Sequence, residues 1–211
     1  MIEVKEIYKS FQSNRVLNNL NMVVSKQESI CISGLNGSGK STLMNICSGL
    51  MLPEKGEIKI FGKSFQNYKE VLEIKRRLGV LLHSNMLYPN YTILENLTFF
   101  SKLLGILNFK ERIGIVLEEL NINQFSGIQV NKLSNGNQRK VGIAKSILND
   151  PELLIIDEPE ANLDNDGSKL LVKILLKRLE AGKSNLFTSH SELFYKKCST
   201  KTFNLKNGRL V

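Results

Sequence analysis

The chain carries at residues 34–42 the stretch Gly34-Leu35-Asn36-Gly37-Ser38-Gly39-Lys40-Ser41-Thr42. It matches the phosphate-binding pattern G-x-x-x-x-G-K-[ST]. A short apolar run, Ser29-Ile30-Cys31-Ile32, precedes it, and Leu43-Met44-Asn45-Ile46-Cys47 follows with the apolar spacing of a helix. The sequence therefore predicts a strand, a glycine-rich loop and a helix, which is the context that this pattern needs.

The residue types of this stretch suit a bound triphosphate. Glycines let the backbone curl so that successive N–H groups face phosphate oxygens, and the helix that follows adds the positive end of its dipole. Lys40 can reach the β- and γ-phosphates, and the Ser41 hydroxyl can ligate Mg²⁺. The alternative is an ordinary Gly/Ser turn that contains a lysine, and the flanking strand and helix disfavour it.

Composition narrows the class of protein. The 211 residues suit one large α/β domain or two small ones. The net charge of +9 favours polyanions such as nucleotide phosphates, nucleic acid or an anionic membrane surface, although solubility alone also explains it. The three cysteines, Cys31, Cys47 and Cys198, lack the spacing of a zinc site or a disulfide framework, and free thiols suit a reducing compartment.

The sequence gives no sign of a signal peptide or a membrane span. Acidic residues follow Met1 where an apolar signal segment would lie, and the longest apolar region, from Leu97 to Phe109, is interrupted by polar residues. We expect a soluble, cytoplasmic protein, and if it works at a membrane, another chain spans the bilayer.

The order of the expected elements indicates an α/β chain. Alternating apolar residues up to Val24 predict strands at the N-terminus, residues 56–62 a further strand, and 78–82 a buried one. Lys75-Arg76-Arg77 is interpreted as a charge run on a solvated face. Later signals predict helices at 141–148 and 170–179, a strand at 185–188, and a hairpin turn at Asn207-Gly208.

The pattern turns helical between about residues 90 and 135. Thr92 and Glu95 have the spacing of a capping box at the start of a helix. Apolar residues then recur at helical spacing up to Leu104, and again from Glu111 to Leu120. We therefore expect a helical insertion in this part of the strand-rich chain.

A second site of chemical interest follows the apolar run Leu153-Leu154-Ile155-Ile156. Such a run is typical of a buried parallel strand, and ligands gather at the carboxyl ends of parallel strands. Asp157 is predicted to emerge beside residues 34–42 and to hold Mg²⁺ through water, and Glu158 to orient and deprotonate an attacking water. The alternative is a strand end followed by a polar turn at Pro159.

With these motifs in place, the chain resembles the ATP-binding subunits of ABC transporters over its whole length. Leu133-Ser134-Asn135-Gly136-Asn137-Gln138 lies where that family has its Leu-Ser-Gly-Gly-Gln signature, and Ala161-Asn162-Leu163-Asp164 lies at its D-loop. His190 matches the switch histidine that follows the last core strand, and Phe11 matches the aromatic residue that stacks on adenine. The motifs occur in the family's order.

The resemblance implies a fold and an activity. The fold is a P-loop NTPase of ABC type over residues 1–211, with a mixed sheet core, an N-terminal antiparallel β region and the helical insertion. The activity is Mg²⁺-dependent ATP hydrolysis that powers transport through ATP-driven dimerisation. The implied partners are ATP, polytopic membrane subunits and a second copy of the chain; no nucleic acid is expected. The subunit would attach peripherally to the cytoplasmic face of the membrane through its membrane partner.

The resemblance also implies roles for individual residues. Lys40 and the backbone of 34–42 hold phosphates, while Ser134 and Gly136 face the phosphate loop of a second subunit. His190 contacts the γ-phosphate and helps to hold Glu158 and the water. For His190 a purely structural role, and for Phe11 simple packing near a hairpin, are the alternatives.

Two departures from the family pattern are visible. Asn135 replaces the first signature glycine and Asn137 the glutamine, while Gly136 keeps the second glycine. Asparagine tolerates the left-handed conformation better than most residues, so we expect the loop to keep its shape. The glutamine expected after the strand at 78–82 is His83, whose imidazole can bind the metal or its water.

A narrower resemblance rests on His83, Leu87-Tyr88-Pro89 and Leu94-Glu95-Asn96-Leu97. These residues look most like the small haem-exporter ATPases of cytochrome c maturation, and are also similar to exporter ATPases for drugs, peptides or polysaccharides. Two other classes stay open. One is a non-transport ABC ATPase that acts on DNA, the ribosome or a protein scaffold. The other is a nucleotide-binding regulatory module with little turnover.

Overall fold

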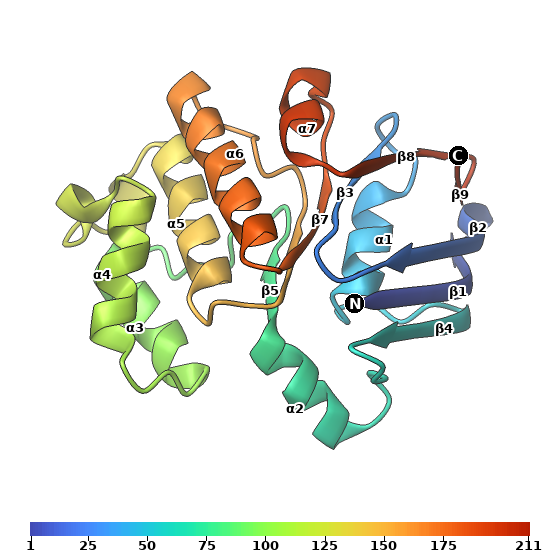
Figure 1. The fold of residues 1–211 in the computed structure, drawn as a ribbon, viewed down its shortest axis with the longest axis horizontal. Coiled ribbons are helices and arrows are strands. Elements are labelled where there is room, and N and C mark those ends of the chain that lie inside the picture. Colours follow the sequence, from blue (N-terminus) through green and yellow to red (C-terminus); the bar gives the residue numbers. More distant parts are fainter.

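The computed structural model describes residues 1–211, and Figure 1 shows how its elements are arranged. The strands are β1 (Ile2–Phe11), β2 (Asn14–Val24), β3 (Ser29–Ser33), β4 (Lys55–Ile60), β5 (Leu78–Leu81), β6 (Leu153–Ile156), β7 (Ser184–Thr188), β8 (Lys201–Lys206) and β9 (Arg209–Leu210). The helices are α1 (Lys40–Cys47), α2 (Tyr68–Arg77), α3 (Ile93–Leu103), α4 (Phe109–Glu119), α5 (Asn135–Ile147), α6 (Asn165–Glu180) and α7 (Glu192–Cys198), with short 3-10 helices η1 (Asn123–Phe125) and η2 (Val130–Lys132).

The strands form two sheets. The smaller sheet is antiparallel, with the order β2-β1-β4, and the larger has the order β5-β6-β7-β3-β8-β9. Its strands from β5 to β8 are parallel, and β9 pairs antiparallel with β8 through the predicted turn at Asn207-Gly208. This mixed sheet beside an antiparallel N-terminal sheet confirms the predicted α/β fold class.

The continuous apolar run of β6 is explained by burial on both faces of the larger sheet. Leu153 and Ile155 belong to a hydrophobic core shared with α1 and the smaller sheet, whereas Leu154 and Ile156 belong to a second core shared with α3 to α7. Because side chains alternate between faces along a strand, both sets must be apolar when both faces are covered. In Figure 1 the helices α3 to α6 lie on one side of β7, and α1 and the smaller sheet on the other.

The helical segment between β5 and α5 begins as predicted. The Thr92 hydroxyl accepts a hydrogen bond from the Glu95 backbone N–H, and the Glu95 carboxylate accepts one from the Thr92 N–H. Asn96 is fully buried and anchors the preceding loop: its side-chain oxygen accepts from Tyr88 N, and its amide nitrogen donates to the carbonyl oxygens of Tyr88, Tyr91 and Thr92. The loop before α3 is therefore held to the helix by one polar side chain.

The helix α2 was not predicted; in the run Lys75-Arg76-Arg77 the first two residues are exposed, and Arg77 is half-exposed and makes specific contacts. Among the α2 residues only Ile74 is buried, so the apolar periodicity that indicates a helix is weak. Arg77 donates from Nε and Nη2 to both Glu152 carboxylate oxygens, at 2.6 and 2.8 Å, and its guanidinium lies 4.0 Å from the centre of the Phe61 ring. The hydrogen bonds to Glu152 raise the pKa of Arg77 and tie α2 to the start of β6.

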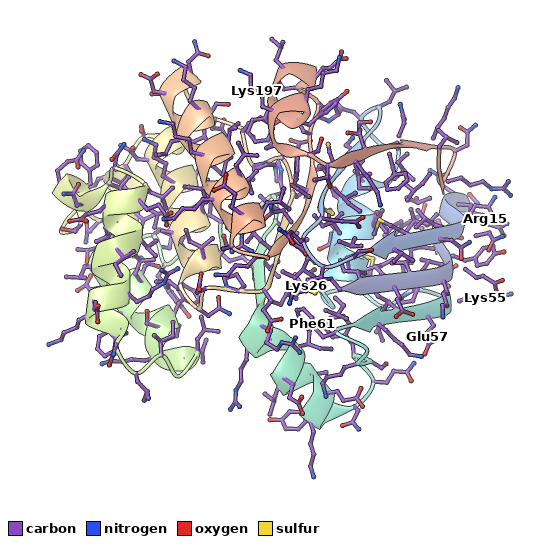
Figure 2. The ribbon with its side chains drawn as sticks, viewed as in Figure 1. Arg15, Lys26, Lys55, Glu57, Phe61 and Lys197 are labelled. Carbon is purple, nitrogen blue, oxygen red and sulfur yellow. The ribbon has the colours of Figure 1, made fainter.

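Exposed cations are spread over separate elements. Figure 2 shows Arg15 of β2, Lys55 of β4 and Lys197 of α7 at the periphery of the molecule, and all three side chains are exposed.

No helix of the structure combines the length and the apolar composition needed to cross a lipid bilayer.

Lys145 of α5 gives a pH-dependent test of how α5 holds the loop after β5. Its ammonium group donates to the carbonyl oxygens of Asn85 and Met86 and lies 5.0 Å from the centre of the Phe100 ring. Burial lowers the pKa of Lys145 to about 8. Between pH 8 and the ordinary lysine pKa, the unfolded chain therefore binds more protons than the folded chain, and the contribution of Lys145 to stability rises with pH.

We expect the free energy of unfolding of the parent protein, relative to Lys145→Met, to increase by about 2 kcal/mol between pH 7 and 9.5. Urea unfolding at both pH values measures it. Lys173→Met, at an exposed site on α6, is the matched control and should show no such change. An equal pH dependence in both variants would contradict the burial of the Lys145 charge.

Candidate functional site

Residues 34–42 connect the end of β3 to the start of α1, as predicted. Gly34 and Gly39 have φ angles of 146° and 105°, in the region that favours glycine. A Cβ atom at Gly34 would lie 2.7 Å from the Leu205 carbonyl oxygen, and one at Gly39 would lie 2.7 Å from Val16 Cγ1. These glycines are required both by backbone conformation and by the close approach of β8 and β2.

The donors of this loop fit an anion. Lys40 folds back over the loop, and its ammonium donates to the carbonyl oxygens of Gly34 and Leu35, at 2.9 and 3.0 Å. The buried Ser38 hydroxyl has no hydrogen-bond partner. Gly39 is the N-cap residue of α1 and has no side chain that could cap the helix. A helix start that lacks a cap leaves its first N–H groups available, which suits a phosphate oxygen.

The loop lies close to the carboxylates after β6. Burial lowers the pKa of the Lys40 ammonium, and the negative charges of Glu158 and Asp157 oppose this shift. Asp157 is only 3% exposed. Glu158 follows with a φ angle of 48°, in the left-handed region that costs a non-glycine residue roughly 1–2 kcal/mol. Backbone strain of this kind concentrates at functional sites.

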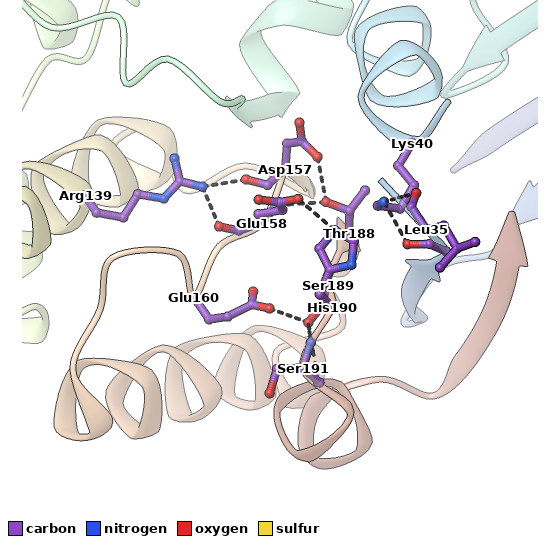
Figure 3. Close-up of polar contacts among 11 residues, drawn as sticks. Leu35, Lys40, Arg139, Asp157, Glu158, Glu160, Thr188, Ser189, His190 and Ser191 are labelled. Carbon is purple, nitrogen blue, oxygen red and sulfur yellow. Dashed lines mark hydrogen bonds and ion pairs between the residues drawn. The ribbon is translucent and has the colours of Figure 1, made fainter. Parts of the chain in front are cut away.

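Thr188, the last residue of β7, positions both carboxylates. Its fully buried hydroxyl donates to Asp157 Oδ1 at 2.6 Å and accepts from the Glu158 backbone N–H at 2.8 Å (Figure 3). Two residues further on, His190 Nε2 lies 3.1 Å from Glu158 Oε1. The structure thus brings the predicted base and the predicted switch histidine into contact.

Arg139 of α5 holds the same loop from the other side. Its buried guanidinium donates from Nη2 to the carbonyl oxygens of Asp157 and Glu158, and from Nη1 to Leu82 O and Asn85 Oδ1. The sequence reasoning did not single out Arg139 or Thr188. The available signal for Arg139 was a charged residue two positions before Val141, the first apolar residue of the predicted helix.

The signature segment opens α5, and Asn135 does not use the left-handed conformation that asparagine tolerates. The Ser134 hydroxyl accepts from the Asn137 N–H at 3.3 Å and caps the helix, and Asn135 and Gly136 already lie in its first turn. Neither has a positive φ angle. Gly136 is required for another reason, since a Cβ atom there would lie 2.9 Å from the Asn162 carbonyl oxygen.

Ser134 and Gly136 are not joined to the phosphate loop of the same chain. No hydrogen bond or salt bridge links them to residues 34–42. In Figure 1, α5 and α1 lie on opposite sides of β7. One copy of the chain therefore keeps the two predicted phosphate-binding segments apart from each other.

Two of the predicted site residues have few contacts. His83 lies two residues beyond the end of β5, is exposed, and makes no hydrogen bond or salt bridge. Phe11 ends β1 with its side chain 46% exposed, and the Lys9 ammonium lies 5.7 Å from its ring centre. Their roles toward metal and adenine stay predictions.

A cavity of about 720 Å³ borders the phosphate loop, within the size range of small-molecule sites. Its walls come from residues 14–16, residues 33–38, residues 204–208, and the turn with the start of α7 that carries His190. Phe11, Asp157 and Glu158 do not line it. No group of three metal-ligating His, Cys, Asp or Glu side chains occurs. A metal held by Ser41 and Asp157 would need further ligands from phosphate and water, as is usual for Mg²⁺.

The fold and the loop geometry define a P-loop nucleotide-binding domain. Residues 17–161, more than half of the chain, match the ABC transporter family. Over the whole chain, the lipoprotein-releasing system ATP-binding protein LolD of Aquifex aeolicus is 32% identical and is covered over 96% of its length. The cell division ATP-binding protein FtsE of Bacillus subtilis is 30% identical and is covered over 95%.

A solved dimeric ATP-binding cassette in a post-hydrolysis state, bound to ADP and Pi, superimposes with a TM-score of 0.90 at 25% identity, covering 100% of this chain and 96% of that one. The Nod factor export ATP-binding protein I of Cupriavidus pinatubonensis is 29% identical over 90% of this chain, which spans 58% of that protein. The chain belongs to the ABC transporter family and is an ATPase domain of the ABC type.

Thr188 provides a test of the site's internal support. Thr188→Val keeps the shape of the side chain but removes the hydroxyl, so a buried carboxylate oxygen and the Glu158 N–H lose a partner. We expect a loss of about 1–3 kcal/mol in unfolding free energy, and a fall in kcat for ATP of roughly tenfold or more because Glu158 loses its fixed position.

Thermal or urea unfolding and a phosphate-release assay measure the two effects. Thr188→Ser retains the hydroxyl and is the control, expected to stay near the parent protein in kcat. A Val variant with parental turnover would show that the hydroxyl does not position Glu158.

Proposed function

We propose that this chain is the ATP-binding and ATP-hydrolysing subunit of an ABC exporter, and that two copies close head to tail around ATP. The single observation that carries the proposal is the contact between His190 Nε2 and Glu158 Oε1 beside the Lys40 loop. A carboxylate and an imidazole that meet next to a phosphate loop are the groups that water activation and γ-phosphate contact need.

In this mechanism the attacking water lies against Glu158, which accepts its proton as the water oxygen bonds to the γ-phosphorus. The bond from that phosphorus to the β–γ bridging oxygen breaks, and ADP and phosphate are formed. Lys40 and the N–H groups of 34–42 hold the phosphates, and His190 contacts the γ-phosphate while orienting Glu158. Mg²⁺, held by Ser41 and Asp157, would neutralise charge on the β- and γ-phosphates.

Dimer closure is supported by the separation of the phosphate-binding segments. The helix start at Ser134 and Gly136 supplies a hydroxyl and N–H groups at a distance from residues 34–42, since α5 and α1 lie on opposite sides of β7. A second copy turned head to tail would place its own Ser134 segment over the phosphates. The dimeric cassette to which this chain is similar lends support to such an arrangement.

The exporter assignment and the membrane partner are supported by relatives that are named for factor export and for lipoprotein release. The loop after β5 offers a surface for a partner: Met86 is 60% exposed, and Arg139 and Lys145 hold the loop to α5. Nucleotide-driven movement of α5 would thus reach this loop. We propose attachment to the cytoplasmic face of the membrane through that partner. The haem-exporter group stays a prediction.

The Glu158→Gln variant tests hydrolysis and closure together. Removing the base should lower kcat by ~100-fold or more. ATP binding should persist, and the closed dimer should accumulate because hydrolysis no longer converts its ATP to ADP and phosphate. Phosphate release, nucleotide binding, and size-exclusion chromatography with ATP and Mg²⁺ measure this. Glu180→Gln, at an exposed position on α6, is the control. Turnover equal to the parent would rule out Glu158 as the base.

Site-directed crosslinking in cells tests the membrane partner. The three native cysteines are buried, so a Met86→Cys variant presents a single accessible thiol. We expect crosslinks to a polytopic membrane protein, and none from Leu52→Cys, which is 65% exposed and lies outside the loop after β5, between α1 and β4. A non-transport role is the second candidate function for this chain, because FtsE, which matches the whole chain, is named for cell division. Crosslinks to ribosomal or DNA-bound proteins would favour that class over a transporter.

A further inference from the structure

Glu160 is a partly buried carboxyl group that the mechanism above does not use. It lies two residues after Glu158, in the loop between β6 and α6. Oε1 accepts a short hydrogen bond from the Ser189 hydroxyl, and Oε2 is buried without a partner (Figure 3). Burial raises the pKa of Glu160, although the Ser189 hydrogen bond opposes the shift. Burying a carboxyl group is costly, so its retention here needs an explanation.

The carboxyl group faces the interior between β3 and α7. Its charge adds to the effect of burial in raising the pKa values of two thiols, Cys31 on β3 and Cys198 on α7, the latter to about 12. It also opposes the pKa lowering that burial imposes on Arg139. Glu160 and Glu158 therefore contact the same turn through different residues, Glu160 through Ser189 and Glu158 through His190.

The Ser189 hydroxyl connects Glu160 to the turn that carries His190. Its side chain is fully buried, and its hydroxyl oxygen accepts from the Ser191 N–H at 3.0 Å, which closes the turn around His190. The hydroxyl has one proton to donate. The Glu160 carboxylate is nearer than the other available acceptor, the Ser191 carbonyl oxygen at 3.4 Å. Without Glu160, the hydroxyl would be free to rotate to Ser191.

Two short segments are thus paired along their length. Thr188 holds Asp157 and the Glu158 N–H, His190 meets the Glu158 carboxylate, and Ser189 meets Glu160. Three consecutive residues, beginning with the last residue of β7, each contact the loop that follows β6. Removing one of these pairings frees the turn that carries the imidazole.

We propose that Glu160 is a positioning residue for His190: through the Ser189 hydroxyl it fixes the turn so that the imidazole meets Glu158. The inference rests on the proposed function for its effect on catalysis, but the arrangement of His190 can be measured without turnover. The loop that holds Glu160 continues through Asn162, before α6, and a Cβ atom on Gly136 would lie 2.9 Å from the Asn162 carbonyl oxygen, so this loop also lies close to the signature segment of α5.

Proton NMR of the imidazoles is the direct test, since the chain has only two histidines. In Glu160→Ala the His190 resonances should shift or broaden, while those of exposed His83 stay unchanged as an internal control. Glu160→Gln keeps an oxygen that can accept from Ser189 and should restore the parental His190 signals. Unchanged His190 resonances in a folded Glu160→Ala protein would overturn the inference.

Measuring kcat with and without His190 tests whether Glu160 acts on hydrolysis through His190. Glu160→Ala and Ser189→Ala should each lower kcat for ATP by roughly tenfold, with the nucleotide Kd within twofold of the parent, and the double variant should lose no more than either single one. In a His190→Ala background, Glu160→Ala should have no further effect. A further tenfold loss there would show that Glu160 acts independently of His190.

The two failures can be told apart. If the parent does not hydrolyse ATP, or if His190→Ala leaves kcat unchanged, the proposed function fails while the NMR result still decides the positioning. If His190→Ala lowers kcat and Glu160→Ala does not, only the positioning inference fails. Should Glu160→Ala not fold, Ser189→Ala gives the same NMR comparison through the other partner of the hydrogen bond.

Discussion

The site depends on the pairing of three parallel strands, β6, β7 and β3, whose carboxyl ends meet at one edge of the larger sheet. From these ends emerge Asp157 with Glu158, the turn with His190, and the glycine-rich loop. Because ladder hydrogen bonds fix each strand against its neighbour, the three segments inherit their relative positions from the sheet. The hydrogen bonds of the Thr188 hydroxyl to Asp157 and to the Glu158 N–H then fix the end of β7 against the end of β6.

Polar groups around this edge are buried at a cost that the hydrophobic cores must offset. Four side chains each have a buried polar atom without a hydrogen-bond partner, and three of them, Ser38, Arg139 and Glu160, lie around the candidate site. An unpaired buried polar atom costs about 1–3 kcal/mol. Such departures from full satisfaction are expected where function sets the residue type. The fourth, Ser101, lies in the helical segment and we have no physical account of it.

The sequence predicted most of the fold because most of its elements carry local signals. The strand at 153–156 is a continuous apolar run, the helix after Thr92 has a capping box, and the turn at Asn207-Gly208 has its characteristic residues. The helix α2 lacks such a signal, since packing requires only Ile74 to be apolar. The tolerance of asparagine for the left-handed conformation is not used at Asn135, since the Ser134 cap places it in an ordinary helical turn.

The sequence by itself determined most of the elements, the phosphate loop, and the carboxylates after β6, because each of these is encoded by a few consecutive residues. Only the tertiary structure decided which polar side chains meet. Glu158 and His190 are 32 positions apart, and Glu160 and Ser189 are 29 apart. Their contacts depend on the strand order that places β6 beside β7. That order follows from covering both faces of the larger sheet with helices and a second sheet, a constraint of packing that no short stretch of residues records.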